Sequence, residues 1–116
     1  MGYDIRGKRA YLSGPMSGLP NLNAAAFDKA QGALIALGAE FVFNPVRAWG
    51  HSDEKPSWYM RHDLHRLTES DGGSPLFDVV VMLPNWHASA GATLEYQVAR
   101  ACGIDITNLQ EVVRGD

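Results

Sequence analysis

The chain has little of several features that mark particular classes of protein. Its 116 residues include one cysteine, Cys102, so an intrachain disulfide is excluded and a reducing cytoplasm is the expected compartment. No apolar run approaches about 18 residues and the first residues are polar, so we expect neither a membrane span nor a signal peptide. The net charge of −3 shows no basic excess, which argues against binding of a nucleic acid polymer.

Two familiar kinds of catalytic site are also missing. The four histidines, His51, His62, His65 and His87, do not form a recognised ligand set, and the pair spaced by three has no third ligand close by. We therefore expect no metal and no other cofactor. The serines lack the G-x-S-x-G context of an activated nucleophile.

What the chain does contain is an alternation of short strands and amphipathic helices. This order predicts one α/β domain over residues 1–116, with a mostly parallel sheet and right-handed crossovers. We expect a flavodoxin-like three-layer sandwich with four or five strands in the order 2-1-3-4. The strands are predicted at residues 9–13, 41–43, 79–83 and 104–106, and the helices between Asn23 and Gly38, from Ser57 onward, and between Ser89 and Gly103.

Several positions between these elements carry expectations of their own. Asn23 is placed to cap the first helix and Gly38 to end it in the left-handed conformation. Residues 46–56 show no periodicity and are predicted to be a surface loop; Trp49, or Trp58 just after it, covers the core or folds over a ligand. For residues 108–116, a helical turn and an arm on a partner subunit both stay open.

Residues 77–102, FDVVVMLPNWHASAGATLEYQVARAC, read as a buried strand, a loop of small residues and a helix. The run VVVML suits a strand covered on both faces, and Ser89 is placed to cap the helix. Spacing puts Glu95 on one helix face with small apolar residues and with Cys102, which we expect to be buried. The sequence thus predicts a carboxylate on an apolar stripe; an ordinary solvent-facing glutamate is the alternative.

A second carboxylate, Asp63, also falls on the apolar side of its helix. A surface position, paired with Arg66 or His62, is the alternative. In open α/β sheets ligands bind beyond the carboxyl ends of the strands, where the strand order reverses. Here that point lies between the strands ending at Ser13 and Leu83, and Asp63 can reach it from the preceding helix.

Three segments carry a family resemblance: YLSGPMSG, the HDL of RHDLHRL, and FDVVVMLPNWHASAGATLEYQVARACG. Their order and spacing resemble the nucleoside 2-deoxyribosyltransferase superfamily, which includes deoxynucleoside monophosphate N-glycosidases. The resemblance covers roughly residues 9–103, and its most specific part is the D-(apolar run)-S-x-G-x-x-x-E pattern. It implies hydrolysis or transfer at the N-glycosidic bond of a small nucleoside or its 5′-monophosphate, and a homodimer or larger assembly.

The resemblance also implies roles for single residues. Glu95 matches the nucleophile that attacks the anomeric carbon, Asp63 the residue that handles protons at the leaving base, and Tyr11 the tyrosine that holds the glutamate. Without the resemblance, Tyr11 reads equally well as an aromatic residue of the core. Asp78 matches an aspartate that opens the central strand and is grouped with these three as catalytic. The positions expected to contact the substrate are Ser13, Gly14, Ser17, Gly18, Ser89 and Gly91.

One position departs from the resemblance. Nucleotide-specific members carry an arginine in the first loop that binds the 5′-phosphate, and this chain has Ser17 there. Gly14 and Gly18 let the backbone approach an anion, so we still expect the 5′-monophosphate to be preferred. Arg47 and Arg61 are either substitutes for the missing arginine or surface charges. The alternative to an enzyme is a non-catalytic nucleotide-binding or sensing module of the same fold, which needs no nucleophile.

Overall fold

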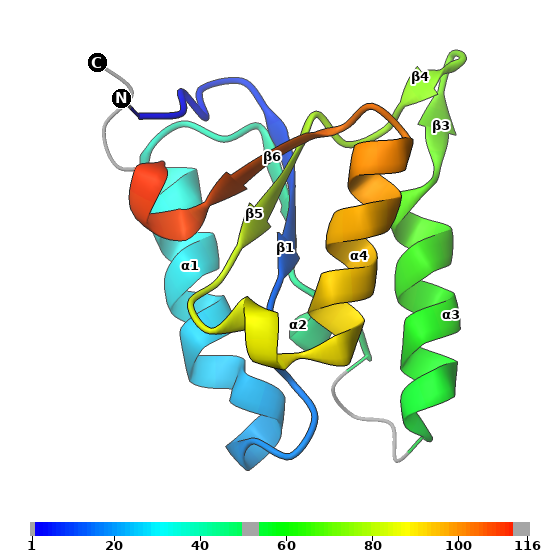
Figure 1. The fold of residues 1–116 in the computed structure, drawn as a ribbon. Coiled ribbons are helices and arrows are strands. Elements are labelled where there is room, and N and C mark those ends of the chain that lie inside the picture. The colour runs from blue at the N-terminus through cyan, green and yellow to red at the C-terminus, as the bar shows by residue number, and fades with distance from the viewer. Residues whose placement is uncertain (1, 50–53, 113–116) are drawn as a thin grey trace.

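The computed structural model describes residues 2–49 and 54–112 (Figure 1). Its main sheet has four parallel strands in the order β2-β1-β5-β6, which is the predicted order 2-1-3-4. The strands are β1 (Arg9–Ser13), β2 (Phe41–Phe43), β5 (Val79–Met82) and β6 (Asp105–Asn108), and β3 (Ser70–Asp71) pairs with β4 (Ser74–Pro75) in a separate small hairpin. The helices are α1 (Ala24–Ala36), α2 (Pro45–Trp49), α3 (Pro56–Leu67) and α4 (Ala90–Ala101), with 3-10 turns at Pro20–Asn23, Trp86–Ala88 and Leu109–Glu111.

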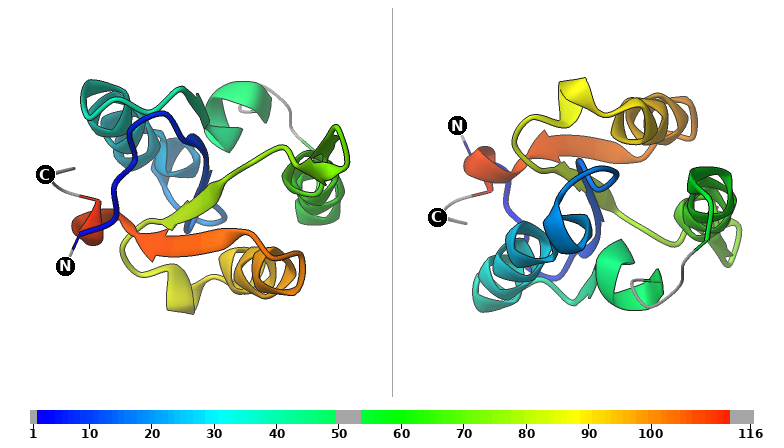
Figure 2. Two further views of the ribbon diagram at one scale, coloured as in Figure 1. Left: turned by 90° about the horizontal axis from the view of Figure 1, so that it is seen from above. Right: turned by 90° about the horizontal axis from the view of Figure 1, so that it is seen from below.

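Helices cover both faces of the sheet, which confirms the flavodoxin-like three-layer sandwich (Figure 2). Helix α1 packs on one face, and α3 and α4 pack on the other. Side chains along a strand alternate between the faces, so Ala10 and Leu12 of β1 face α1. Tyr11 and Ser13 therefore point to the side of α4.

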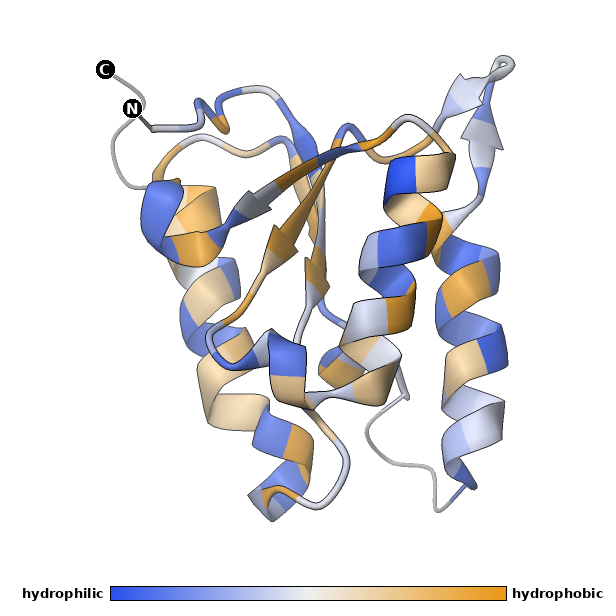
Figure 3. Ribbon diagram, in the orientation of Figure 1, coloured by the Kyte–Doolittle hydropathy of each residue, from blue (hydrophilic) through white to orange (hydrophobic). Residues whose placement is uncertain are grey.

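Strand β5 is buried along its whole length, as the apolar run predicts. Val79 and Val81 join the core under α1, and Val80 and Met82 join the core under α3 and α4. Figure 3 shows β5 as continuously hydrophobic, while the helices alternate between hydrophobic and hydrophilic residues. Among the described residues, no helix is both long enough and apolar enough to cross a membrane.

Helix α2 occupies a stretch where the sequence predicts a surface loop, and that prediction is wrong. The Asn44 side chain caps the helix by accepting a hydrogen bond from the Val46 N–H at 3.1 Å. Pro45 has the fixed φ that suits a first helical residue. Trp49 at the end of α2 is half-buried, and residues 50–53 of the predicted loop lie outside the described residues.

Two other predictions about helix ends are wrong. Asn23 precedes α1 in the left-handed conformation, with φ of 64°, and its side chain donates to the Pro15 carbonyl at 3.0 Å instead of capping the helix. Cys102 is exposed, because α4 ends one residue earlier and the chain turns away at Gly103, where φ is +75°. Gly38 ends α1 with φ of +101°, as predicted.

The end of the chain differs slightly from the prediction. Strand β6 covers residues 105–108 instead of 104–106, and it continues into the 3-10 turn at residues 109–111. This turn is one of the two alternatives that the sequence leaves open for the tail. Residues 113–116 lie outside the described part of the chain.

Candidate active site

A cleft of about 1180 Å³ opens at the carboxyl ends of β1 and β5. The loop after β1, the start of α3 and the start of α4 converge there, at the lower edge of the sheet in Figure 1. This is the position predicted from the strands that end at Ser13 and Leu83. Both unusual carboxylates of the chain, Asp63 and Glu95, line the cleft.

Glu95 lies on the face of α4 that packs against the sheet, and it is only 5% exposed. The Tyr11 hydroxyl donates to Oε2 of Glu95, and the Ser13 hydroxyl donates to Oε1 at 2.7 Å. Tyr11 and Ser13 are two residues apart on β1, so both reach the same side of the sheet. The predicted burial of Glu95 is confirmed, and each of its oxygens is held by a hydroxyl group.

The Tyr11 hydroxyl has two partners but only one proton. It also lies 3.3 Å from the carbonyl oxygen of Asp63. When Glu95 is ionised, Tyr11 donates to it; when Glu95 is protonated, the carboxyl can donate to Tyr11 and Tyr11 to the carbonyl. The ring is held by Phe43 and Phe77, with centroid distances of 5.1 and 5.4 Å. Burial and the nearby carboxyls raise the pKa of Tyr11 well above 10, so it stays protonated.

Asp63 is also 5% exposed, on the side of α3 that faces the cleft. The indole N–H of Trp49 donates to its Oδ1 at 2.6 Å. Arg66, a partner in the surface alternative, instead forms an ion pair with Glu69 at 3.0 Å. Asp63 is therefore a buried carboxyl that α2 and α3 position together.

Burial raises the pKa of both carboxyls. The pKa of Glu95 rises to about 8 because the carboxyl is desolvated and the charge of Asp63 adds to the effect, while the hydrogen bonds from Tyr11 and Ser13 oppose it. Burial raises the pKa of Asp63 to about 6, against the hydrogen bond from Trp49. Between these two values the pair holds one proton, so near neutral pH the cleft contains both an acid and a carboxylate.

We expect the free energy of unfolding to fall as the pH rises from about 4.5 to about 8. Glu95 ionises near its ordinary pKa of 4.5 in the unfolded chain but near 8 in the folded protein. Over this interval the folded state binds more protons, so each pH unit lowers stability by up to about 1.4 kcal/mol. Glu95→Gln should flatten the dependence of Tm on pH, whereas Glu40→Gln, an exposed control, should not. An unchanged slope in Glu95→Gln would contradict the raised pKa.

Asp78 does not lie with the other residues that the resemblance groups as catalytic. It precedes β5 at the amino end of the sheet, level with Arg9, whereas Glu95 contacts Ser13 at the carboxyl end. Four residues along a strand separate these levels by about 13 Å. The Asp78 Oδ2 accepts a hydrogen bond from the Arg9 backbone N–H at 2.8 Å. Its carboxylate ties β1 to β5, so we assign it a structural role in place of the catalytic one.

Most of the positions expected to contact a substrate do border the cleft. Ser13 meets it through its hydrogen bond to Glu95. Ser89 also caps α4, as predicted, because its Oγ accepts from the Ala92 N–H at 3.1 Å. The five expected positions that line the cleft directly are Gly14, Ser17, Gly18, Ser89 and Gly91.

Two of these glycines have structural reasons of their own. A Cβ at Gly14 would lie 2.7 Å from the Cβ of Leu83, so close packing of the loop against the end of β5 requires glycine. Gly18 has φ of +79°, a conformation that side chains rarely adopt. Neither glycine is therefore by itself a sign of an anion site.

The sequence does not predict the contact between Trp49 and Asp63. It does carry a signal for helix α2, since an asparagine followed by proline is a typical helix start. Glu54 lines the cleft just before α3, in a stretch without periodicity, and has no local signal.

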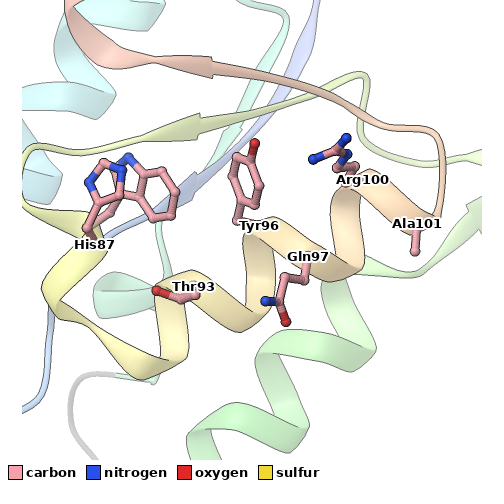
Figure 4. A pocket seen from close by; sticks show the side chains of 7 residues that line it. His87, Thr93, Tyr96, Gln97, Arg100 and Ala101 are labelled. Carbon is pink, nitrogen blue, oxygen red and sulfur yellow. The ribbon is translucent and has the colours of Figure 1, made fainter.

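A second hollow, of about 680 Å³, lies along α4 (Figure 4). The rings of Trp86 and Tyr96 stack there with centroids 4.9 Å apart, near His87 and Arg100. Among the described residues that line this hollow, none is a carboxylate. The candidate active site is therefore the cleft that contains Glu95.

The described histidines, His62, His65 and His87, do not gather around a metal site. Within residues 2–49 and 54–112, no group of three or more His, Cys, Asp or Glu side chains could hold a metal ion. His62 stacks on Trp58, with ring centroids 3.7 Å apart, and its Nδ1 lies 2.8 Å from the Trp58 carbonyl oxygen. His51 lies outside the described residues.

Comparison with known protein families gives one match, which covers most of the chain. A family described as a domain of unknown function (DUF4406) matches residues 8–108. The chain belongs to this family. The match runs from the start of β1 to the end of β6 and includes Tyr11, Asp63 and Glu95. No curated protein and no solved structure matches the chain. The family description names no activity, so function has to be argued from the cleft.

Proposed function

We propose that this protein cleaves the N-glycosidic bond of a small nucleoside or nucleotide, by hydrolysis or transfer, with Glu95 as the nucleophile. One observation carries the proposal: Glu95 is a buried carboxylate in a large cleft, with each oxygen held by a hydroxyl group. The resemblance to nucleoside 2-deoxyribosyltransferases supports it, because the same residues carry that resemblance.

The first step releases the base. One oxygen of Glu95 forms a bond to the anomeric carbon as the bond from that carbon to the base nitrogen breaks. The bonding electrons leave with the base, and the carboxyl proton of Asp63 passes to it. Tyr11 and Ser13 hold the Glu95 carboxylate in one orientation, which reduces the freedom lost on reaching the transition state.

The second step frees Glu95. A water oxygen forms a bond to the anomeric carbon, the bond to Glu95 breaks, and the carboxylate of Asp63 takes the proton from the water. Nucleoside and water thus become free base and free sugar. If a second base replaces the water, the result is transfer.

We expect kcat/KM to be highest between about pH 6 and pH 8. The reactive form carries the proton on Asp63 and the charge on Glu95. It is the minor of the two single-proton forms, because the pKa of Glu95 is the higher, and it is populated only while the pair holds a single proton. Below about pH 6 both carboxyls are protonated, so the nucleophile carries no charge, and above about pH 8 both are ionised, so no acid is left. A profile of kcat/KM against pH measures both limbs; a rate that keeps rising above pH 9 would contradict the role of Asp63 as an acid.

A panel of deoxynucleosides, ribonucleosides and their 5′-monophosphates tests the proposed function. Free base, separated by chromatography, should appear with at least one substrate and should be absent with Glu95→Gln. Binding without release from any substrate would favour the non-catalytic nucleotide-binding module of the same fold.

The resemblance also leads us to propose a homodimer or larger assembly. A domain of this size buries limited area alone and gains from association. Light scattering at micromolar concentration measures the mass; a monomer would contradict this proposal.

A further inference from the structure

The cleft that holds Glu95 is lined by apolar, neutral polar and acidic side chains. Glu54, at the start of α3, is exposed, while the two catalytic carboxyls are buried. A ligand in this cleft meets negative charge, and the described residues that line it supply no lysine or arginine to compensate. Three of these residues carry carboxyl groups: Glu54, Asp63 and Glu95.

Arg47 and Arg61, the candidate substitutes for the arginine that is missing at Ser17, lie outside the cleft. The guanidinium of Arg47 is held by Asp28, with Nε donating to Oδ1 at 2.8 Å and Nη2 donating to Oδ2. Arg61 is exposed on α3 and does not line the cleft. Neither side chain is placed to neutralise a phosphate there.

Two backbone donors beside the cleft are engaged within the protein. At the start of α4, the Ala92 N–H donates to the Ser89 side chain at 3.1 Å. In the loop after β1, the Leu19 N–H donates to the Met16 carbonyl at 3.2 Å. At each of the two usual places for a phosphate without an arginine, the helix terminus and the first loop, one backbone donor is thus already used.

The remaining walls suit an uncharged ligand. Met16, Leu22, Met60 and Leu94 present apolar surface to the cleft, which fits a flat base and the carbon face of a sugar. The Glu54 carboxylate can accept a hydrogen bond from a sugar hydroxyl, whereas it repels a phosphate.

We infer that the cleft takes an uncharged nucleoside in preference to its 5′-monophosphate, an inference that rests on the proposed function. The phosphate would bring up to two negative charges beside Glu54, Asp63 and Glu95, and the 5′-hydroxyl brings none. From the sequence we expect the 5′-monophosphate to be preferred, because Gly14 and Gly18 let the backbone approach an anion. The structure gives Gly14 a different reason, its close packing against Leu83, so this glycine no longer supports a phosphate site.

The test compares kcat/KM for base release from each deoxynucleoside and from its 5′-monophosphate. The nucleoside should react at least about tenfold more efficiently, and salt should narrow this ratio because it screens the repulsion. Glu54→Gln should narrow the ratio severalfold, whereas Glu40→Gln, which removes an exposed carboxylate outside the cleft, should leave it unchanged. A monophosphate that reacts as well as its nucleoside would overturn the inference.

A binding measurement separates failure of this inference from failure of the proposed function. If no base is released, calorimetric titration of the wild-type protein with the same pairs replaces the kinetic ratio. Tighter binding of the nucleoside would then support the charge preference even though the proposed reaction had failed. Tighter binding of the monophosphate, or no binding of either form, would overturn the preference.

Discussion

Glu95→Gln is expected to abolish base release while the protein stays folded. The amide has nearly the size of the carboxyl; its oxygen still accepts a hydrogen bond from one of the two hydroxyls, Tyr11 or Ser13, and its NH2 group can donate to the other. It does not attack the anomeric carbon, because a neutral amide is a poor nucleophile. Loss of a nucleophile of this kind lowers turnover by roughly 10⁴-fold or more. Chromatography of the free base measures the rate.

The matched control is Glu40→Gln. Glu40 is exposed and lies outside the cleft, so this variant should keep the turnover of the wild type. Thermal melting should show Glu95→Gln at least as stable as the wild type above pH 7, since it lacks a buried charge. Retained turnover in a folded Glu95→Gln variant would end the assignment of the nucleophile.

Asp63→Asn is expected to lower kcat by about 10²- to 10⁴-fold, with a much smaller change in KM. In the proposed mechanism the carboxyl supplies the proton that the departing base needs in the transition state, while asparagine can still accept the hydrogen bond from Trp49. The decrease in kcat caused by Asp63→Asn should be smaller for substrates whose base leaves more readily, because such a base depends less on protonation. Kinetics with two bases of different leaving ability measure this difference.

Two results would count against that role. Equal losses in binding and in turnover would make Asp63 a binding residue. A loss that is the same for good and poor leaving groups would show that Asp63 does not protonate the base.

The fold and the centre of the site were predictable because their signals are local and periodic. The run from Val79 to Met82 is buried on both faces, as an unbroken apolar stretch predicts. The spacing of small residues on α4 places Glu95 on the buried face, and the parallel order of strands brings the ends of β1 and β5 together. These features depend on the spacing of apolar residues and on the order of strands and helices, and both can be read from the sequence.

The parts that were not predictable depend on contacts between distant segments. Trp49 and Asp63 are 14 residues apart, and their hydrogen bond exists only because α2 and α3 meet beside Phe43. The position of Asp78 at the amino end of the sheet follows from strand direction, but a family motif places it in the same group as Glu95 without regard to distance. Cys102 fits the spacing of the buried stripe on α4, but the helix ends before it.

The central claim is that Glu95 forms a covalent bond to the anomeric carbon, and the stereochemistry of the product tests it most directly. Two successive displacements return that carbon to its starting configuration, whereas direct attack by water inverts it. Proton NMR of the reaction, recorded before the released sugar mutarotates, should show the β-anomer first. An α-anomer formed first, or no sugar released from any nucleoside or nucleotide, would contradict the account.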